Sequence, residues 1–406
     1  MSAQIWLEKG RDRPVRQRHP WVVSGSIGRV AGDRTDGDIA DGVVVDGDVV
    51  DVHDVGNNWL ARGLWNGQSQ IRVRLLTWDP DEAIDSAFWR GRLERALAGR
   101  TALAQDSDTT AYRLVHAESD GLPGLIVDRY GDFLAVQFLV LGVDRRREML
   151  VNLLQELLTP RGIYERSDVE VREKEGLEQQ TGVLAGEAPP EALEVVENGL
   201  RFWVGLRAGQ KTGFYLDQRE NRARLPAFCE GAEVLDAFAY TGAFGVYAAA
   251  GDAARVTFLD SSSVALEVAG HHLAHNGHDP ARHAFIEGDV FSVLRAFRSE
   301  GRSFDVVVLD PPKFAPTQRD VKRASRAYKD VNLLAFQLLR PGGILFSTSC
   351  SGAVDIDLFQ KILFGAAVDA ERDAQIIGTL YQASDHPVAL TFPEGAYLKG
   401  LICRVW

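Results

Sequence analysis

Short apolar runs alternate with helix-length segments through the second half of the chain. The runs are "AEVLDAF", "RVTFLD", "HAFIEGD", "FDVVVLD" and "GGILFSTSC", all rich in Val, Leu, Ile or Phe. Strands with this character lie in parallel sheets, because crossover helices cover both faces of such a sheet. The pattern therefore predicts that residues 196–406 form a doubly wound, mostly parallel α/β sheet.

The first half of the chain follows two other patterns. Residues 1–80 hold short alternating runs such as "GDVVDVHDV", "WLARGLW" and "IRVRLL", which predict a small β-barrel or sandwich. In residues 81–195, "DSAFWRGRLERALAGRTAL" and "DRRREMLVNLLQELL" have helical spacing, and the strand-like runs "GLIVDRYG" and "FLAVQFLVLG" lie between them. These residues predict a small α+β middle domain. Its last segment, "AGEAPPEALEVVENG", indicates a boundary or the start of a hairpin.

Composition argues for a cytoplasmic protein without membrane segments. Hydrophobic residues make up 45% of the chain and charged residues 25%. No apolar stretch approaches the roughly 20 residues of a membrane helix, and no apolar run near the start resembles a secretory signal. The cysteines, Cys229, Cys350 and Cys403, are odd in number and widely spaced, which fits a reducing compartment and no zinc site.

The charge distribution leaves nucleic acid open as a partner. A net charge of −12 argues against it, and acidic residues concentrate in "GDRTDGDIADGVVVDGDVVD". Residues 9–18 and 313–329 are nevertheless basic. In the second stretch Arg319, Lys322, Arg323 and Arg326 are spaced as one face of a helix. Such a face is usually only solvated, but beside an active site it favours a row of contacts with the phosphates of a nucleic acid.

Acidic residues at the strand ends indicate the cofactor. Asp236 closes the first run, Gly242 and Gly245 follow in the turn, and Asp260 and Asp289 end the next two runs. Ligands of doubly wound folds bind beyond the carboxyl ends of the strands. The G-x-G-x-x-G of dinucleotide sites is absent, and an acid in its place suits an amine. Asp236 would bind an amine, Asp260 lies where an acid binds ribose hydroxyls in such folds, and Asp289 could accept from the amino group of adenine. An amine, a ribose and an adenine are the parts of S-adenosylmethionine. Each Asp could instead cap a helix, and an NAD enzyme with a degenerate loop is the other alternative.

The fourth and fifth runs carry candidate chemistry. Asp310 begins Asp-Pro-Pro, which in methyltransferases orients a planar base amide, and Phe314 is placed to stack on that base. A simple Pro-Pro turn is the alternative. Cys350 ends the neighbouring strand. A thiolate that adds to carbon 6 of cytosine makes carbon 5 nucleophilic. A buried packing cysteine is the alternative, but we expect the small hydroxyl residues before Cys350 to leave room for a substrate.

These motifs resemble the bacterial class I ribosomal RNA large-subunit methyltransferases that make 5-methylcytosine. The resemblance spans almost the whole chain and rests on "RQRHPWVVSGSI", "SDGLPGLIVDRYGD", "QKTGFYLDQRENR", "LDAFAYTGAFG", "VVLDPPKFA", "STSCSG" and "DHPVALTFPEGAYLKGLICRVW". It implies an RNA-binding PUA domain at 1–80, an α+β middle domain at 81–195 and a Rossmann-like methyltransferase domain at 196–406. The implied cofactor is S-adenosylmethionine. The implied partner is 23S ribosomal RNA, either naked or within a large-subunit precursor, with no metal and no membrane; a homodimer is left open.

The resemblance also assigns residues. Asp236, Asp260 and Asp289 would hold the methionine amine, the ribose and the adenine, Asp310 would orient the base, and Cys350 would be the nucleophile. Further cofactor contacts would come from Tyr215, Arg219, Phe238, Tyr240, Gly242 and Val290. Contacts with RNA would come from Arg18, His19, Trp21, Lys313, Phe314, Arg319, Lys322 and Arg323. A barrel-core position is the alternative for Trp21.

One departure from related enzymes changes the mechanism. Many RNA cytosine-5 methyltransferases carry a second Cys in the Asp-Pro-Pro motif for product release, and this chain has Lys313 there. The base for proton removal is therefore unassigned. "HHLAHNGHDPARH" has helically spaced histidines, but no acid or Cys completes a metal site. Two other functions stay open: N-methylation of guanine, and a non-catalytic RNA-binding assembly factor.

Overall fold

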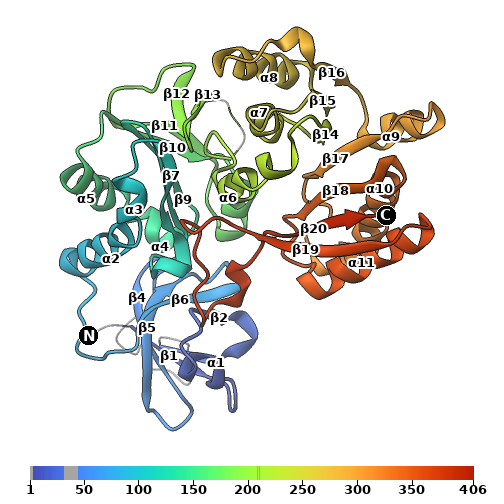
Figure 1. The fold of residues 1–406 in the computed structure, drawn as a ribbon. Coiled ribbons are helices and arrows are strands. Elements are labelled where there is room, and N and C mark those ends of the chain that lie inside the picture. The colour runs from blue at the N-terminus through green and yellow to red at the C-terminus, as the bar shows by residue number, and fades with distance from the viewer. Residues whose placement is uncertain (1–2, 32–43, 208, 210) are drawn as a thin grey trace. The chain divides into compact units, whose positions relative to one another are not determined.

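The protein is described by a computed structural model that covers residues 3–31, 44–207, 209 and 211–406 (Figure 1). The chain forms two compact units. The first holds Met1–Val195, Val204–Phe214 and Asp385–Gly395, and the second holds Val196–Trp203, Tyr215–Ser384 and Ala396–Trp406. The three predicted domain ranges stay predictions. Much of the predicted acidic stretch, residues 32–43, lies outside the described residues.

The first unit begins with a six-stranded sheet in the order β2-β6-β5-β4-β1-β3. Its strands are β1 (Ala3–Leu7), β2 (Trp21–Val23), β3 (Ile27–Val30), β4 (Val49–His53), β5 (Trp59–Trp65) and β6 (Ile71–Thr77), and α1 (Arg13–Arg16) precedes β2. The three alternating runs of the sequence became β4, β5 and β6. Residues such as Ile5, Val50, Val52 and Val73 are fully buried and form the core of this sheet. The predicted β-rich N-terminal structure is confirmed.

A second sheet in the same unit has the order β11-β10-β9-β8-β7. Its strands are β7 (Ala111–His116), β8 (Leu125–Tyr130), β9 (Phe133–Phe138), β10 (Gly162–Ser167) and β11 (Gln180–Gly186), accompanied by α2 (Ser86–Ala98), α3 (Thr101–Ala104), α4 (Leu141–Asp144) and α5 (Arg147–Leu158). Asp85 caps α2 by accepting from Phe88 N at 3.0 Å. Helix α5 ends at Leu158, just before Pro160, because proline disfavours a helical residue before it. The predicted α+β arrangement is confirmed.

A two-stranded hairpin follows the Pro-Pro segment. It pairs β12 (Leu193–Glu197) with β13 (Leu200–Val204). Asn198 and Gly199 form the turn with φ angles of 49° and 80°. Asn-Gly suits such a turn because both residues tolerate left-handed backbone. The predicted start of a hairpin is confirmed.

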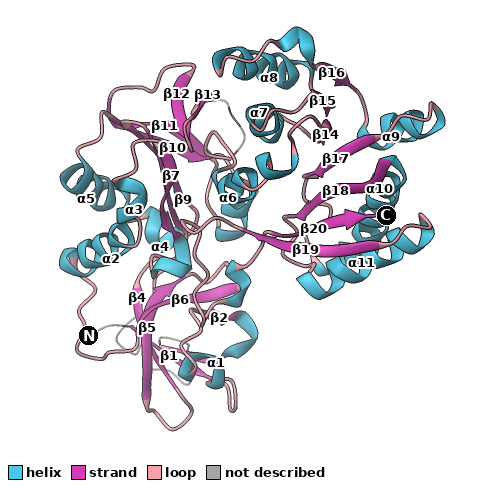
Figure 2. Ribbon diagram, in the orientation of Figure 1, coloured by secondary structure: helices cyan, strands magenta, loops and turns pink. Residues whose placement is uncertain are grey.

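The second unit is built on a seven-stranded sheet in the order β16-β15-β14-β17-β18-β20-β19 (Figure 2). The strands are β14 (Glu233–Ala237), β15 (Arg255–Asp260), β16 (Ala284–Glu287), β17 (Phe304–Leu309), β18 (Leu339–Ser349), β19 (Ala374–Tyr381) and β20 (Lys399–Val405). The helices are α6 (Arg219–Ala223), α7 (Ala243–Ala250), α8 (Ser263–His275), α9 (Val290–Ser299), α10 (Val321–Leu338) and α11 (Ile356–Asp369). β20 pairs antiparallel with both β18 and β19, and the other neighbouring pairs are parallel. The predicted doubly wound, mostly parallel sheet is confirmed.

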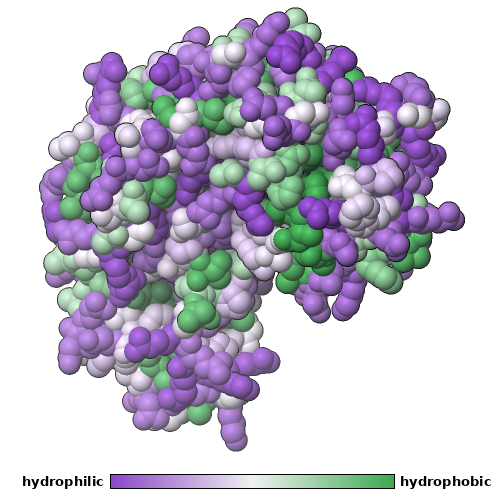
Figure 3. Space-filling view, in the orientation of Figure 1, coloured by the Kyte–Doolittle hydropathy of each residue, from purple (hydrophilic) through white to green (hydrophobic). Residues whose placement is uncertain are grey.

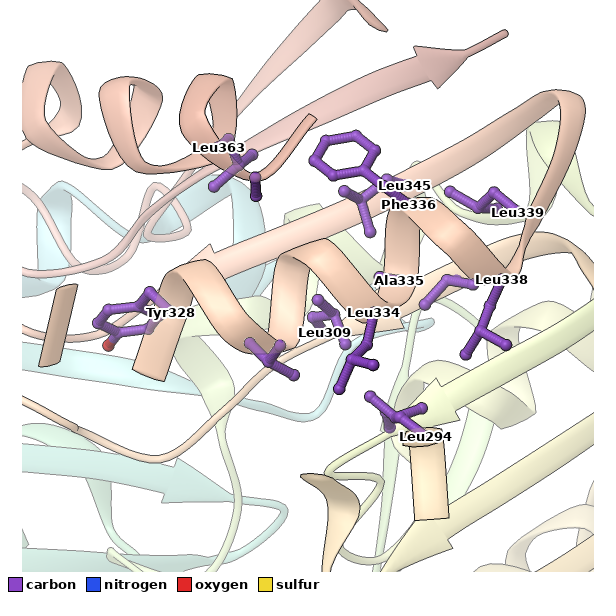
Figure 4. Packing of buried hydrophobic residues seen from close by; sticks show 14 of the residues in the cluster. Leu294, Leu309, Tyr328, Leu334, Ala335, Phe336, Leu338, Leu339, Leu345 and Leu363 are labelled. Carbon is purple, nitrogen blue, oxygen red and sulfur yellow. The ribbon is translucent and has the colours of Figure 1, made fainter. Parts of the chain in front are cut away.

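Helices cover both faces of this sheet, because successive strand residues point to opposite sides. Leu235, Val307 and Leu345 share one cluster with α9, α10 and α11. Figure 4 shows Leu334, Ala335 and Leu338 of α10 in this cluster. On the other face the Phe258 ring lies against the Gly245 backbone of α7. Burial on both faces explains why the strands of the sequence are continuous apolar runs.

The chain order of the strands reverses beside β14. This strand pairs with β15 on one side and β17 on the other, so the connections leave in opposite directions. In open α/β sheets such a switch point opens a crevice at the carboxyl ends of the strands. On the face seen in Figure 3, hydrophobic side chains gather in the region of β14, β17 and β18. Within the described residues, no helix has both the length and the apolarity to cross a membrane.

Candidate active site

Four chemistry-bearing residues meet at one edge of the second sheet. Asp236 is the penultimate residue of β14, and Asp260 is the last residue of β15. Asp310 directly follows β17, and Cys350 directly follows β18. These strands are parallel neighbours, and in the register Leu309 pairs with Ser347. Their carboxyl ends therefore share an edge. The structure brings together what the sequence had placed up to 114 positions apart, between Asp236 and Cys350 (350 − 236).

Asp236 is a buried acid on which the Arg222 charge acts only from beyond ion-pair distance. It is 1% exposed, and one carboxylate oxygen accepts from Gly245 N at 2.9 Å. Within the described part of the chain, no Lys or Arg lies within ion-pair distance of it. Burial raises the pKa of Asp236 to about 8; Asp310 and Asp260 raise it further, while the Gly245 N–H lowers it. A cationic group placed here would restore the carboxylate.

The turn after β14 adopts an unusual backbone. Phe238 and Tyr240 have φ angles of 63° and 49°, and Gly242 has 76°. A side chain at Gly242 would meet the Ala269 Cβ at 2.5 Å and the Phe258 ring at 2.9 Å. Left-handed backbone at bulky residues costs about 1–3 kcal/mol each and concentrates at ligand sites. Glycine at position 242 therefore serves both the left-handed backbone and the close packing against Ala269 and Phe258.

Asp260 and Asp289 have different local roles. Asp260 is half-buried and accepts from Tyr240 N at 2.8 Å and Ser262 N at 3.0 Å, which ties the β14 turn to β15. Asp289 is exposed and caps α9, accepting from Ser292 N at 2.9 Å. The helix-cap alternative is therefore real for Asp289, and its contact with adenine stays a prediction. Val290 beside it is buried.

These residues fit S-adenosylmethionine. A buried acid without an ion-pair partner among the described residues suits the methionine ammonium, and the next strand ends in a second acid. The structure places Tyr215, one of the predicted cofactor contacts, with its ring edge-on to the Tyr240 ring at 5.7 Å. Burial, with Asp310 second, raises the pKa of Tyr215, so its hydroxyl stays neutral.

A buried ion pair fixes the segment that carries Tyr215 and Arg219. Arg222 donates from Nε and Nη2 to the two carboxylate oxygens of Glu197, both at 2.7 Å, and Nη2 also reaches Tyr215 O at 2.9 Å. Both partners of the pair are almost fully buried. Arg219 is 2% exposed, and its guanidinium lies 3.6 Å from Glu220. Sequence analysis did not identify Glu197 or Arg222.

Asp310 is held by groups from two other elements. Thr348 of β18 donates to Asp310 Oδ1 at 2.6 Å, and Gln218 Nε2 donates to the same oxygen at 2.8 Å. Asn221 in turn donates to Gln218 Oε1 at 2.6 Å and to Tyr381 O at 2.9 Å. The carboxylate is thus oriented before any ligand binds. Gln218 lies in the segment "QKTGFYLDQRENR", and no sequence pattern near it indicates that it contacts Asp310.

The serines around Cys350 form a network with Tyr328 of α10. Ser349 donates to the Tyr328 hydroxyl at 2.8 Å, which is 2.9 Å from Ser351 Oγ, and Ala315 N donates to Ser351 Oγ at 3.0 Å. Cys350 itself is half-buried. Room for a substrate beside Cys350 therefore stays a prediction, because the preceding hydroxyl side chains point into the protein. Ser347, Thr348 and Ser349 are buried, and the last two have hydrogen-bond partners in the protein.

Phe314 is half-buried and packs against aromatic neighbours. Its ring centroid lies 4.8 Å from that of Tyr328 and 6.4 Å from that of Phe238. The loop from Asp310 to Thr317 contains no helix, as expected after two prolines. Stacking of Phe314 on a base stays a prediction.

The basic residues after Asp-Pro-Pro are exposed, but they do not all lie on one helix. Lys322, Arg323 and Arg326 lie on α10, whereas Arg319 lies in the preceding 3₁₀ turn, Gln318–Asp320. The expected four-residue helix face is therefore corrected to three residues plus a turn. The helix begins later because Thr317 and Asp320 form a capping box. Lys313 is exposed as well.

In the first unit, two of the three predicted RNA contacts already have partners. His19 Nε2 lies 3.1 Å from Glu394, and the Trp21 indole donates to Glu118 at 2.9 Å and packs edge-on against Phe392. Trp21 is half-exposed, so the barrel-core alternative is wrong. Arg18 is exposed and lines a cavity of about 460 Å³ in this unit. Their binding of RNA stays a prediction.

The histidine segment ends α8. Asn276 and Gly277 terminate the helix, Gly277 with a φ angle of 81°. His272 is buried, with Nδ1 2.9 Å from Thr241 O, and Trp203 N donates to its Nε2 at 2.9 Å. This histidine is therefore a structural link to β13. Across the described ranges, no cluster of His, Cys, Asp or Glu is arranged to hold a metal ion.

Comparisons with known proteins agree with this site. Residues 171–372 match the S-adenosylmethionine-dependent methyltransferase family, and residues 5–78 match a PUA-like domain. The fold is similar over 100% of both chains to a methyltransferase complexed with SAH, at a TM-score of 0.85 and 22% identity. It is also similar to a protein of Streptococcus mutans described as a SAM-dependent methyltransferase, at a TM-score of 0.83 and 22% identity over 100% of both chains.

Sequence relatives extend over the whole chain. The ribosomal RNA large subunit methyltransferase I of Shewanella amazonensis is 50% identical over 406 residues, and that of Aeromonas hydrophila is 49% identical over 405 residues, in each case covering 100% of both chains. The acid-lined sheet edge, the PUA-like sheet and this identity agree: the chain is a S-adenosylmethionine-dependent methyltransferase and belongs to the ribosomal RNA large subunit methyltransferase I family.

Proposed function

We propose that this protein methylates carbon 5 of a cytosine in 23S ribosomal RNA, through a covalent adduct between Cys350 Sγ and carbon 6 of the base. The observation that carries the proposal is the placement of Cys350 and Asp310 after neighbouring parallel strands, with Thr348 bonded to Asp310. The names of the relatives support ribosomal RNA of the large subunit as the substrate. The exposed basic residues of α10 supply phosphate contacts.

The reaction needs a nucleophile because carbon 5 of cytosine is unreactive. The Cys350 thiolate forms a bond to carbon 6, and the π electrons of the 5,6 double bond move to carbon 5. After methylation, a base takes the proton from carbon 5, the electrons of that carbon–hydrogen bond re-form the double bond, and the carbon–sulfur bond breaks with its electrons returning to sulfur. Bound S-adenosylmethionine supplies the electrophilic methyl group.

Asp310 orients the base toward the cysteine. Its carboxylate is suited to accept from the exocyclic amine of cytosine, and the hydrogen bonds from Thr348 and Gln218 set its direction. Orientation fixed before binding lowers the entropy that the reaction must lose. Asp236, the Phe238–Gly242 turn and Asp260 hold the cofactor at the adjoining strand ends.

The decisive test is Cys350→Ala, with Cys229→Ala as the matched control because Cys229 is buried near the start of β14. We expect Cys350→Ala to lose methylation while still binding S-adenosylmethionine in isothermal titration, and Cys229→Ala to keep both. Wild-type protein should form a covalent adduct with RNA that contains 5-fluorocytosine, seen as a shifted band. Full activity of Cys350→Ala would overturn the proposal and favour N-methylation of guanine, which needs no nucleophile.

A further inference from the structure

A buried lysine lies beside Cys350. Lys399 begins β20 and pairs with Ser349, the residue before Cys350, in the antiparallel β18–β20 ladder. Its side chain is 5% exposed, and Nζ donates to Ser351 O at 2.7 Å and to Tyr397 O at 2.6 Å. The amine is therefore fixed on the carbonyl of the residue that follows Cys350. The sequence places the two residues 49 positions apart (399 − 350), which hid the relationship.

No carboxylate forms an ion pair with this amine. In the part of the chain that the structure describes, its two hydrogen-bond partners are neutral carbonyls. A buried ammonium without an anion is costly, because little water remains to solvate it. Burial lowers the pKa of Lys399 to about 8, whereas Cys350 and then Asp355 raise it and Lys313 lowers it. Cys350 is the first of these neighbours and the one that can become an anion next to the amine.

Two of the described tyrosines also interact with Cys350, and neither is a cation. They are Tyr215 and Tyr328, and burial raises the pKa of each, so both stay neutral near pH 7. Asp310, which directly follows the neighbouring strand β17, has an acidic side chain and so cannot supply a positive charge. The Tyr328 hydroxyl also holds Ser349 and Ser351, the two residues on either side of Cys350. The cysteine backbone is thus fixed, and Lys399 is the cation that β20 brings to it.

We propose that Lys399 is the ion-pair partner of Cys350 and stabilises the thiolate that attacks the base. When the pair forms, the Cys350 sulfur–hydrogen bond breaks and its proton moves to the neutral amine, which gives thiolate and ammonium. The thiolate then adds to carbon 6, and the same pair re-forms when the carbon–sulfur bond breaks. The chemical role of this pair rests on the proposed function; its existence does not.

The test measures the thiolate directly and needs no RNA. The rate of Cys350 alkylation by iodoacetamide, followed by peptide mass spectrometry across pH, gives the pKa of the thiol. In wild type we expect the alkylation rate to reach half its maximum, its midpoint, at a pH below about 8.5, the ordinary pKa of a cysteine thiol. Lys399→Met should raise that midpoint by about one pH unit or more and slow alkylation near pH 7 about tenfold. Lys399→Arg should keep the low midpoint. Lys361→Met, at a highly exposed lysine of α11, is the control and should match wild type.

A wild-type midpoint at or above about 8.5, or an unchanged midpoint in Lys399→Met, would overturn the ion pair. If Lys399→Met does not fold, the reciprocal experiment decides, because coupling between two groups is symmetric. Cys350→Ala should lower the pKa of Lys399, measured by NMR of labelled lysine amines, and an unchanged value contradicts the proposal. If the wild-type protein shows the ion pair but Cys350→Ala keeps full methylation activity, only the cytosine mechanism is rejected.

Discussion

The Thr348 hydroxyl donates to Asp310 Oδ1 at 2.6 Å, across the join between β18 and β17. This bond links the strand that ends at Cys350 to the strand that ends at Asp310. Both groups directly follow strands whose last residues, Leu309 and Ser349, are fully buried in the sheet. The β17–β18 register therefore helps to set the distance between Cys350 and Asp310, the proposed nucleophile and base-orienting acid, and variants at Thr348 report on it.

Thr348→Val should lower kcat while leaving the affinity for S-adenosylmethionine unchanged. Valine keeps the shape of threonine but removes a hydrogen bond to a charged group, worth about 1.5–3 kcal/mol. If that energy acts in the transition state, the rate falls about 10- to 100-fold. Initial rates at saturating cofactor measure this effect, and Thr348→Ser, which keeps the hydroxyl, is the control. An unchanged kcat in Thr348→Val would show that the bond does not position Asp310 for the reaction.

Binding of S-adenosylmethionine should release a proton from Asp236. The raised pKa of about 8 means that the carboxyl is mostly protonated near pH 7 in the absence of a cation, and the ligand ammonium lowers that pKa again. Affinity should therefore rise as pH increases from about 6 toward about 8. For the same reason, stability from the protonated form is present at low pH and is lost as pH rises through about 8.

Titration calorimetry in buffers of different ionisation enthalpy measures this proton release. Asp236→Asn should abolish it, flatten the pH dependence and weaken binding about tenfold or more, since a charge-assisted contact is lost. Asp305→Asn, at a partly exposed acid at the start of β17, is the control and should keep the proton release. A wild-type affinity that is independent of pH would contradict the assignment of Asp236.

Gly242→Ala should reduce both stability and cofactor binding. The substitution combines left-handed backbone with a Cβ that would lie 2.5 Å from the Ala269 Cβ. Gly231→Ala is a matched control, because Gly231 has a similar φ angle of 66° and open space around the added carbon. We expect Gly231→Ala to cost about 1 kcal/mol and Gly242→Ala more, because only the second creates overlap. Urea denaturation gives both values. Equal losses would mean that the backbone angle alone matters.

Lys322→Gln with Arg323→Gln should weaken RNA binding and its dependence on salt. Both side chains are exposed on α10, close after the Asp-Pro-Pro loop. Each lost phosphate contact reduces the slope of log affinity against log salt by about 0.7 for single-stranded RNA. Filter binding over a range of salt concentrations measures the slope. Arg295→Gln with Arg298→Gln on α9 is the charge-matched control. Equal losses in both double variants would indicate an effect of overall charge only.

The sequence determined the two sheets of the first unit, the doubly wound sheet of the second, and the meeting of Asp236, Asp260, Asp310 and Cys350 at one edge. These predictions succeeded because buried parallel strands leave a continuous apolar signal, and their carboxyl ends must share an edge. The tertiary structure alone decided the surroundings of these residues. Glu197, Gln218, Tyr328, Thr348 and Lys399 reach the site from separate elements.

Local patterns also misjudged what short side chains do. The hydroxyl residues before Cys350 suggest free space in the sequence, but all three are buried, and Thr348 and Ser349 are hydrogen-bonded within the protein. The cap that Asp289 forms on α9 was only an alternative in the sequence, and its contact with adenine stays a prediction. Periodicity encodes which face a residue takes, because that depends only on its own strand or helix. Which partner it meets depends on long-range strand order and register, so only the folded chain decides it.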